Sequence, residues 1–271
     1  MAVMITPHIL IGRLDDRTPI RLRRVNLPIA HLPREMAGIR IAFLPDLHLG
    51  RLVKPSFVRK ALRLGADLKA PVMVLGGDIV GRPDHHALAL PELLAELPRE
   101  QAVYAILGNH EYYRGEEDIP GMLSAAGVRL LVNEHVLIGP DGREADSGPR
   151  LALVGLDDYG EGRPDYAAAL RGLDPNVCTI LLGHSPVLAE LPDARGDLML
   201  SGHTHGGQVR LGPLIPSRQT MNHKYIDGLV QGAHFPIFIS RGLGVTGVAL
   251  RLCCPPELWD ITLVPRGEPK A

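Results

Sequence analysis

The chain has 271 residues, with 29 Lys and Arg against 30 Asp and Glu, so its formal net charge is -1. Hydrophobic residues make up 45% of the sequence, which excludes an intrinsically disordered chain. The balanced charge and the 4% aromatic content argue against stable nucleic-acid binding, because such proteins need a basic surface and stacking platforms.

The apolar pattern predicts alternating strands and helices along the chain. We expect strands over residues 21–27, 39–44, 72–75, 102–107, 151–156, 178–182, 198–200, 237–240 and 258–264. Helices are expected over residues 56–68, 86–97, 121–126 and 166–171, the first with Ser56 as its N-cap. No change in composition marks a domain boundary, so we expect one α/β domain over residues 1–271.

Three features bear on where the protein works. Three cysteines are an odd number and too few for a disulfide framework, which favours a reducing compartment. No stretch approaches about 20 apolar residues, and residues 1–14 lack a basic segment ahead of an apolar one, so neither a transmembrane helix nor a signal peptide is expected. We expect a cytoplasmic protein, with peripheral contact to the inner membrane left open and the oligomeric state undetermined.

Five of the predicted strands are each followed directly by side chains of types that bind metals. These side chains are Asp46 and His48, Asp78, Asn109 and His110, His184, and His203 and His205. In layered α/β folds, functional sites collect beyond the strand ends, because the sheet holds those loops rigidly. Imidazole, carboxylate and amide oxygen suit Zn, Mn or Fe, and the set contains no cysteine, so a structural thiolate zinc site is excluded. These side chains are too many for one ion. Seven of the eight suit two ions that share a bridging carboxylate.

The same motifs, taken in order, resemble those of the calcineurin-like metallophosphoesterase superfamily. Its pattern is D-x-H, GD, GNH[DE], GH and GHxH, and this chain reads Asp46-Leu47-His48, Gly77-Asp78, Gly108-Asn109-His110-Glu111, Gly183-His184 and Gly202-His203-Thr204-His205. Finer features, such as Asn133-Glu134-His135, resemble the bacterial YkuE/YaeI-type branch. The resemblance covers about residues 38–264. It implies a four-layer α/β/β/α sandwich with a dinuclear metal site at the strand ends.

The resemblance also implies how these side chains divide the work. One ion would be held by Asp46, His48, Asp78 and His205, and the other by Asp78, Asn109, His184 and His203. A water or hydroxide between the two divalent ions, with Mn the first choice ahead of Fe or Zn, would attack phosphorus in line. His110 would protonate the leaving oxygen, a task for a group that titrates near neutral pH. His110, Asp78 and Asn109 are thus the expected catalytic residues.

One position departs from the superfamily pattern. The superfamily often reads GDxxD, where the second Asp orients the catalytic histidine, whereas this chain has Gly81 there. Imidazoles at such sites usually need a partner that fixes their orientation and tautomer. The sequence leaves three alternatives: Glu111 substitutes, Asp84 substitutes, or His110 is less well oriented.

The substrate is less well defined by the sequence. The candidates for substrate contact are Arg51, Tyr112, Arg114 and Arg241. A solvated surface role, or a packing role for the tyrosine, is equally expected. A small phosphodiester or nucleotide-linked substrate, cleaved at a phosphodiester or pyrophosphate bond, is expected ahead of a monoester. The alternatives are a lipid pyrophosphatase of the UDP-diacylglucosamine type, with residues 211–215 as an apolar lip, a non-catalytic interaction module, and a DNA nuclease, which the balanced charge disfavours.

Overall fold

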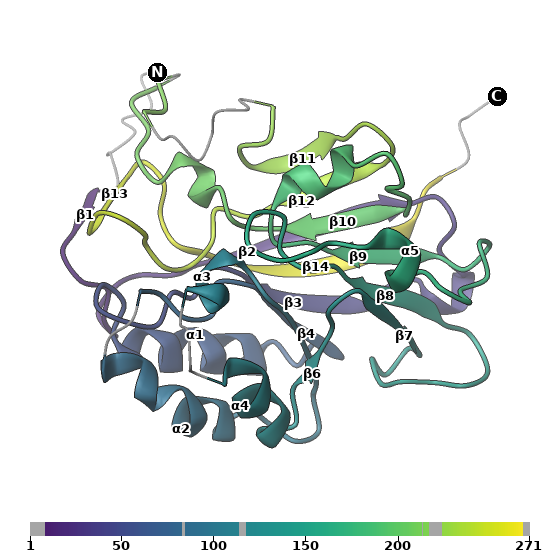
Figure 1. Ribbon diagram of the computed structural model, residues 1–271, viewed down its shortest axis with the longest axis horizontal. Coiled ribbons are helices and arrows are strands. Elements are labelled where there is room, and N and C mark those ends of the chain that lie inside the picture. The colour runs from purple at the N-terminus through teal and green to yellow at the C-terminus, as the bar shows by residue number, and fades with distance from the viewer. Residues whose placement is uncertain (1–8, 83–84, 114–117, 213, 217–223, 268–271) are drawn as a thin grey trace, which may run out of the picture.

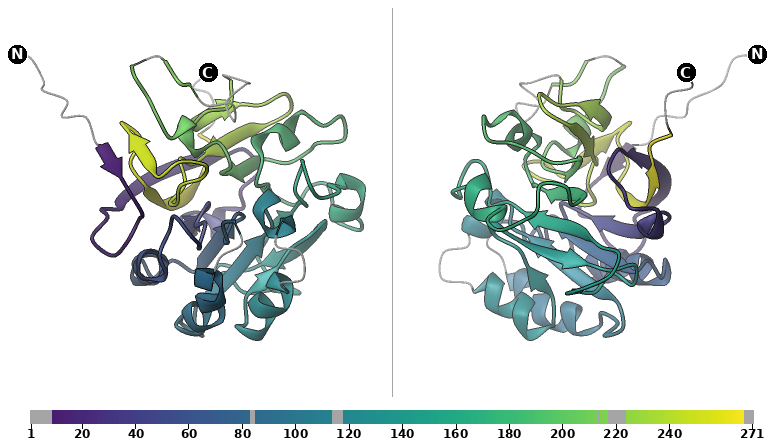
Figure 2. Two further views of the ribbon diagram at one scale, coloured as in Figure 1. Left: turned by 60° about the vertical axis from the view of Figure 1, so that its left-hand side comes forward. Right: turned by 90° about the vertical axis from the view of Figure 1, so that its right-hand side faces the viewer.

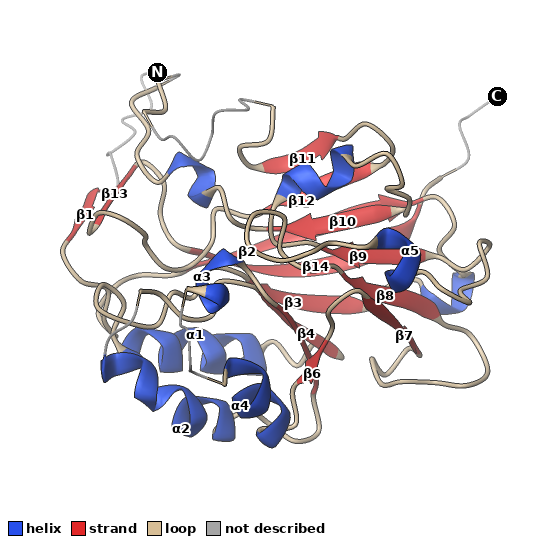
Figure 3. Ribbon diagram, in the orientation of Figure 1, coloured by secondary structure: helices blue, strands red, loops and turns tan. Residues whose placement is uncertain are grey.

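The computed structural model describes residues 9–82, 85–113, 118–212, 214–216 and 224–267. Within these residues, two six-stranded sheets pack face to face, and helices cover the outer face of each sheet (Figures 1 and 3). The resemblance predicted this four-layer α/β/β/α arrangement, and the structure confirms it. No helix in the described ranges is both long enough and apolar enough to cross a membrane.

The first sheet is mixed, with four parallel strands that extend to one of its edges. Across the sheet the strands are β2 (Arg21–Ile29), β14 (Glu257–Pro265), β3 (Arg40–Leu44), β4 (Val72–Gly76), β5 (Ala102–Ile106) and β6 (Arg129–Leu130). Strands β3 to β6 run parallel, with Ile41 opposite Val72 and Val72 opposite Ala102, whereas β14 runs antiparallel to β3. The carboxyl ends of β3, β4 and β5 therefore lie side by side.

The second sheet is also mixed, but its parallel strands lie in the middle. Across it the strands are β11 (Gly228–Gln231), β12 (Pro236–Ile239), β10 (Leu198–Ser201), β9 (Thr179–Leu182), β8 (Leu151–Gly155) and β7 (Glu134–Ile138). The four inner strands run parallel, and β11 and β7 pair with them antiparallel at the two edges. A separate two-stranded ribbon is formed by β1 (Ile9–Ile11) and β13 (Leu250–Leu252).

Short helices complete the outer layers. The first sheet is covered by α1 (Pro55–Asp67), α2 (Leu90–Ala95) and α4 (Ile119–Ala125), and the second by α5 (Tyr166–Ala169) and the 3₁₀ helix η3 (Pro186–Glu190). Three further 3₁₀ turns, η1 (Arg34–Met36), η2 (His85–Ala89) and η4 (His205–Gly207), and the single-turn helix α3 (Asn109–Tyr112) lie in connections.

Strand periodicity divides the apolar core between the layers. Along β3, Ile41 and Phe43 pack between the two sheets, whereas Ala42 and Leu44 pack beneath the helices of the first sheet. Such a strand is apolar at every position because both faces of its sheet are covered. The continuous apolar runs that predicted the inner strands therefore have a direct structural cause.

The structure corrects two helix predictions. Helix α1 begins at Pro55, with Lys54 as its N-cap, so Ser56 lies inside the first turn and the predicted cap is wrong. Proline favours this first position because its missing N–H has no helical partner there in any case. The helix expected over residues 86–97 is divided into η2 and α2, and Pro91 lies in the first turn of α2.

Candidate metal centre

The predicted ligands come from five strands of two different sheets. Strand β3 leads to Asp46 and His48, and β4 and β5 lead to Asp78 and Asn109, all from the first sheet. Strands β9 and β10 of the second sheet lead to His184 and to the pair His203 and His205. The packing of the two sheets brings these loops together at one end of the sandwich (Figures 1 and 2).

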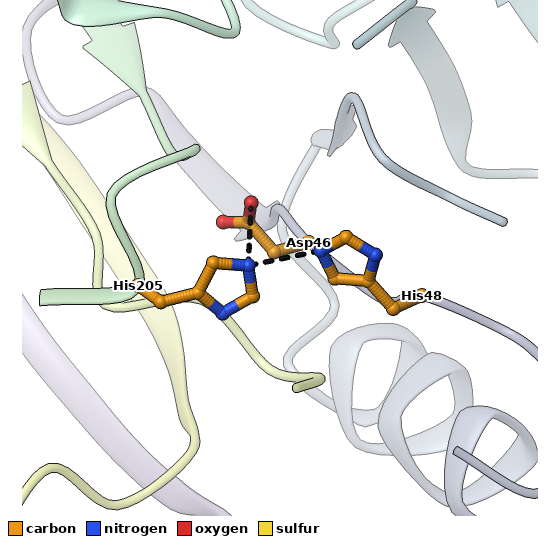
Figure 4. A group of neighbouring side chains, drawn as sticks. All are labelled: Asp46, His48 and His205. Atoms are coloured by element: carbon orange, nitrogen blue, oxygen red, sulfur yellow. Dashed lines mark hydrogen bonds and ion pairs between the residues drawn. The ribbon is translucent and has the colours of Figure 1, made fainter. Parts of the chain in front are cut away.

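One group of ligand atoms is formed by Asp46, His48 and His205 (Figure 4). The Nε2 atom of His205 lies 2.9 Å from Nε2 of His48 and 3.6 Å from Oδ1 of Asp46. All three side chains are buried. Two imidazole nitrogens and one carboxylate oxygen thus converge on one small volume.

Asp78 joins this group to a second one. Its Oδ2 atom lies 3.4 Å from Nε2 of His48 and 3.2 Å from Nε2 of His184. The second group contains Asp78, His184 and His203, and the rings of the two histidines lie 5.1 Å apart. The carboxylate of Asp78 therefore lies between the two groups, as a bridging ligand would.

Several side-chain polar atoms of the predicted ligands, in and beside these groups, are buried without a hydrogen-bond partner among the described residues. They are Asp46 Oδ2, His48 Nδ1, Asn109 Oδ1, His184 Nε2 and His203 Nδ1. A buried polar atom without a partner costs about 1–3 kcal/mol, so such a concentration of them in one place needs an explanation. Divalent cations provide one, because nitrogen and oxygen donors of these types suit Mn, Fe or Zn. The residues present fit two ions.

Hydrogen bonds from the backbone orient the carboxylates and one imidazole. Asp46 Oδ1 accepts a hydrogen bond from the backbone N–H of His203, and Asp78 Oδ1 accepts one from the backbone N–H of His110, both at 2.9 Å. Nδ1 of His184 donates to the carbonyl oxygen of Gly76 at 2.9 Å. This bond leaves Nε2 of His184 as the unprotonated nitrogen of the neutral ring, which faces Asp78.

Burial and mutual contacts shift the pKa values at the site. Burial lowers the pKa of His48 to about 3 and that of His203 to about 4, so both rings are neutral and able to bind a cation. Burial raises the pKa of Asp46 to about 7. Burial is also the largest influence on His184 and lowers its pKa, but the charge of Asp78, the contact with its carboxylate, the charge of Asp46 and the bond to Gly76 together outweigh burial and raise the pKa to about 10.

The backbone of the ligand loops is strained. Asp46, His48, Asp78, His203 and His205 all have positive φ angles, between 49° and 68°. The left-handed region is uncommon for residues other than glycine, although Asp and His tolerate it better than most. The sheets hold these turns in place, and each turn directs its side chain toward the site.

Glu111 organises the site but does not contact His110. Its carboxylate accepts hydrogen bonds from the backbone N–H groups of Asp78, Val80 and Gly108 at 2.7–3.0 Å. The suggestion that Glu111 orients His110 is therefore wrong, and Asp84 lies outside the described residues. His110 packs edge-on against His48, with ring centres 4.5 Å apart, and its Nδ1 atom has no partner among the described residues.

A pocket of about 260 Å³ opens beside the two groups. It is lined by His48, Arg51, Leu52, Gly81, Arg82, His110, Val245, Thr246 and Gly247. His48 and His110 both line the pocket and connect it to the ligand groups. Burial lowers the pKa of His110. The pocket therefore joins the predicted general acid to two arginines.

The other predicted substrate contacts have partners elsewhere or cannot be placed. The hydroxyl of Tyr112 donates to Asp157, and the guanidinium of Arg241 forms an ion pair with Asp227 at 2.6 Å. Neither side chain lines the pocket, so their roles stay predictions. Arg114 lies outside the described residues.

Two residues at the site were not found from the sequence. Arg82 lines the pocket, and it directly follows Gly81 in the loop after β4. Arg251 is 1% exposed; its Nη2 atom lies 3.2 Å from Nδ1 of His205 and 2.9 Å from the carbonyl oxygen of Arg241. The sequence does contain a signal for Arg251, since a single arginine interrupts an otherwise apolar segment over residues 247–254.

Comparison with known proteins agrees with this geometry. Residues 39–207 match the family described as calcineurin-like phosphoesterase. The chain is 32% identical to "Phosphodiesterase YaeI" of Escherichia coli (strain K12), over 87% of this chain and 86% of that protein. It is 30% identical to "Uncharacterized metallophosphoesterase YkuE" of Bacillus subtilis (strain 168), over 86% of this chain and 81% of that protein.

A longer relative has the same domain. The chain is 31% identical to the "Transmembrane protein with metallophosphoesterase domain" of Bos taurus, over 97% of this chain but 62% of that protein. The chain thus spans less than two thirds of the length of this relative. The family match covers more than half of the chain, and the buried Asp and His groups supply the metal ligands that the family name implies. The chain therefore belongs to the calcineurin-like phosphoesterase family.

Proposed function

We propose that this chain hydrolyses phosphodiester or pyrophosphate bonds with two bound divalent ions, of which Mn is the first to test. One observation carries the proposal: the Asp78 carboxylate lies 3.2 Å and 3.4 Å from imidazole nitrogens of two different ligand groups. Paired ions at such a site supply a nucleophile at neutral pH and neutralise charge on the transferring phosphoryl group.

The chain's own residues would divide the remaining work. Asp46, His48 and His205 hold one ion, and Asn109, His184 and His203 hold the other, with Asp78 common to both. His110 is the general acid, because it lines the pocket beside the ligand groups. Burial lowers the pKa of His110, so its imidazolium is a stronger acid toward a leaving alkoxide oxygen, while a smaller fraction of it is protonated at neutral pH.

The two arginines of the pocket favour a diester or pyrophosphate over a simple monoester. Arg51 and Arg82 line the pocket that His110 also lines, on the side where the leaving group would lie. Guanidinium groups pair strongly with phosphate oxygens. A nucleotide-linked or other phosphorylated leaving group would use both cations, whereas a monoester would leave them without a partner. The printed name of YaeI, a phosphodiesterase, points in the same direction.

The test compares two chromogenic substrates, bis-p-nitrophenyl phosphate and p-nitrophenyl phosphate. Metal-stripped protein is supplied separately with Mn²⁺, Zn²⁺, Fe²⁺ or Mg²⁺, and Asp78→Asn is compared with Asp16→Asn, an exposed carboxylate on the surface. We expect metal-dependent hydrolysis with a preference for the diester, and its loss in Asp78→Asn alone. A monoester preference would contradict the substrate class, and bound metal without any hydrolysis of either ester, or of a nucleoside diphosphate ester, would favour the non-catalytic alternative.

A further inference from the structure

The β1–β13 ribbon has an unusual distribution of side chains. In its register, Ile9 lies opposite Leu252 and Ile11 opposite Leu250, so these four side chains share one face. On the other side of β13, Val209 pairs with Leu252 and therefore lies on the same face. We call this surface the apolar face; it is formed by Ile9, Ile11, Val209, Leu211, Leu250 and Leu252.

The apolar face points to solvent, and the charged side chains point inward. Ile11 is 81% exposed and Leu211 is 55% exposed, and nearby Val248 is 56% exposed. On the opposite face, Arg251 is buried, and Arg210 forms an ion pair with Asp227 at 2.6 Å. An ordinary edge ribbon turns its apolar side to the core and its charges to water. This ribbon does the reverse, which marks an interaction surface.

The composition of the surface indicates what kind of partner covers it. Residues 9–13, 209–214 and 248–252 contain only aliphatic residues, glycine, proline, alanine and arginine, with no aromatic or acidic residue. Surfaces that lie on membranes place apolar side chains beside basic ones. Aliphatic side chains without aromatics suit acyl chains, which offer no groups for more specific contacts.

The charges around the surface favour anionic headgroups. Arg13, Arg51 and Arg82 are exposed, and none of them forms an ion pair with a carboxylate in the described part of the chain. Arg13 lies two residues after the end of β1, and the next residue, Leu14, pairs with Val53, two residues after Arg51. Basic residues close to a bilayer add about 1 kcal/mol each of attraction to anionic lipids.

The apolar face also continues to the pocket. Val245, Thr246 and Gly247 line the pocket, and the chain then passes through exposed Val248 into β13. Figures 1 and 2 show β1 and β13 side by side, apart from the two large sheets. We propose that the apolar face docks on an anionic lipid bilayer and thereby places the pocket mouth at the level of the headgroups.

The proposal is tested by vesicle flotation, which needs no catalysis and so does not depend on the proposed function. The vesicles contain either phosphatidylcholine alone or phosphatidylcholine with roughly one third phosphatidylglycerol. The variants are Ile9→Thr/Ile11→Thr, which keeps β-propensity, and Ile11→Asp. The control is Leu88→Thr/Leu229→Thr, which changes two other exposed aliphatic side chains, 71% and 49% exposed.

We expect the unaltered chain and the control to float with the anionic vesicles at low ionic strength, and the two apolar-face variants to partition at least tenfold less. The far-UV circular dichroism spectrum and the midpoint of thermal unfolding should stay unchanged in both, which shows that they fold. Equal partitioning of all proteins, or no binding to either vesicle, would overturn the proposal. If light scattering showed that the chain self-associates, and only the apolar-face variants lost this association, the apolar face would bind a second copy of the chain instead.

Discussion

The side chain of Glu111 is bound to the backbone of Asp78: its Oε2 atom accepts the Asp78 N–H at 2.9 Å and the Gly108 N–H at 2.7 Å. Its other oxygen accepts the Val80 N–H at 3.0 Å. A single buried carboxylate thus joins the loops that follow β4 and β5. The position of the bridging carboxylate depends on a residue that need not touch any ion.

Glu111→Gln should therefore weaken both stability and metal binding. The amide nitrogen cannot accept a hydrogen bond, so either the Val80 N–H or both the Asp78 and Gly108 N–H groups lose their partner, at a cost of about 1–3 kcal/mol per group in the free energy of unfolding. Urea unfolding and metal analysis of the purified protein measure the two effects. Glu161→Gln is the control, since that carboxylate is exposed and, within the described part of the chain, accepts a hydrogen bond from the Tyr113 hydroxyl alone. Equal stability and equal metal content of the two variants would show that the hydrogen bonds from the backbone to Glu111 are unimportant.

Gly81→Asp should lower activity, although it restores the commoner superfamily residue. A Cβ atom at position 81 would lie 2.9 Å from the carbonyl oxygen of His48, which is closer than real Cβ atoms approach. The segment that carries His48 would have to move, and a shift of this kind disturbs the ligand geometry. Thermal unfolding and kcat for bis-p-nitrophenyl phosphate are the measurements. An increased kcat at unchanged stability would instead mean that His110 lacks only its usual partner.

Metal binding should release protons, and the affinity should rise with pH. In the metal-free protein, the pKa of His184 is raised to about 10 and that of Asp46 to about 7, so at pH 6 both groups hold a proton that a cation must displace. His48 and His203, with lowered pKa values, are already neutral and release none. We expect roughly two protons released at pH 6 and about one at pH 8. Calorimetry in buffers of different ionisation enthalpy counts them, and equal release at both pH values would contradict the assignment.

Arg82→Ala should impair diester and pyrophosphate hydrolysis more than monoester hydrolysis. Loss of a charge-assisted hydrogen bond costs about 1.5–3 kcal/mol, which corresponds to a loss of roughly tenfold or more in kcat/KM for substrates that use the pocket. Arg51→Ala should show the same selectivity. Arg171→Ala, an exposed arginine beyond α5, is the matched control. If all three variants had the same ratio of diester to monoester activity, Arg51 and Arg82 would have no part in substrate selection.

Much of the fold could be predicted because the inner strands are apolar at every position. Strands such as β4 and β9 lie within one or two residues of their predicted ranges. The ribbon strands β1 and β13 were missed because each has three residues and its apolar side faces water. Pattern analysis assumes the opposite orientation, and it therefore cannot recognise a strand whose apolar side faces solvent.

The ligand types and their spacing were also readable, since each follows a buried strand. The relative positions of the ligands in the folded chain could not be predicted, because periodicity does not tell which strand ends of the two sheets face each other. The contacts of Glu111 with the backbone and of Arg251 with His205 depend on that meeting. Pairings across such distances in the sequence leave no local pattern.

The left-handed backbone at five ligand positions has a consequence for the dynamics of the chain. Each such residue costs about 1 kcal/mol or more relative to an ordinary conformation. The cost falls on the loops, while the apolar sheets beneath them contribute most of the stability. In the metal-free protein these loops should open far more often than β4 or β9, and their amide hydrogens should exchange with solvent correspondingly faster. A cation that binds only the ordered loops stabilises them by its binding free energy. Metal binding should therefore slow amide hydrogen exchange only in the loops at this end of the sandwich.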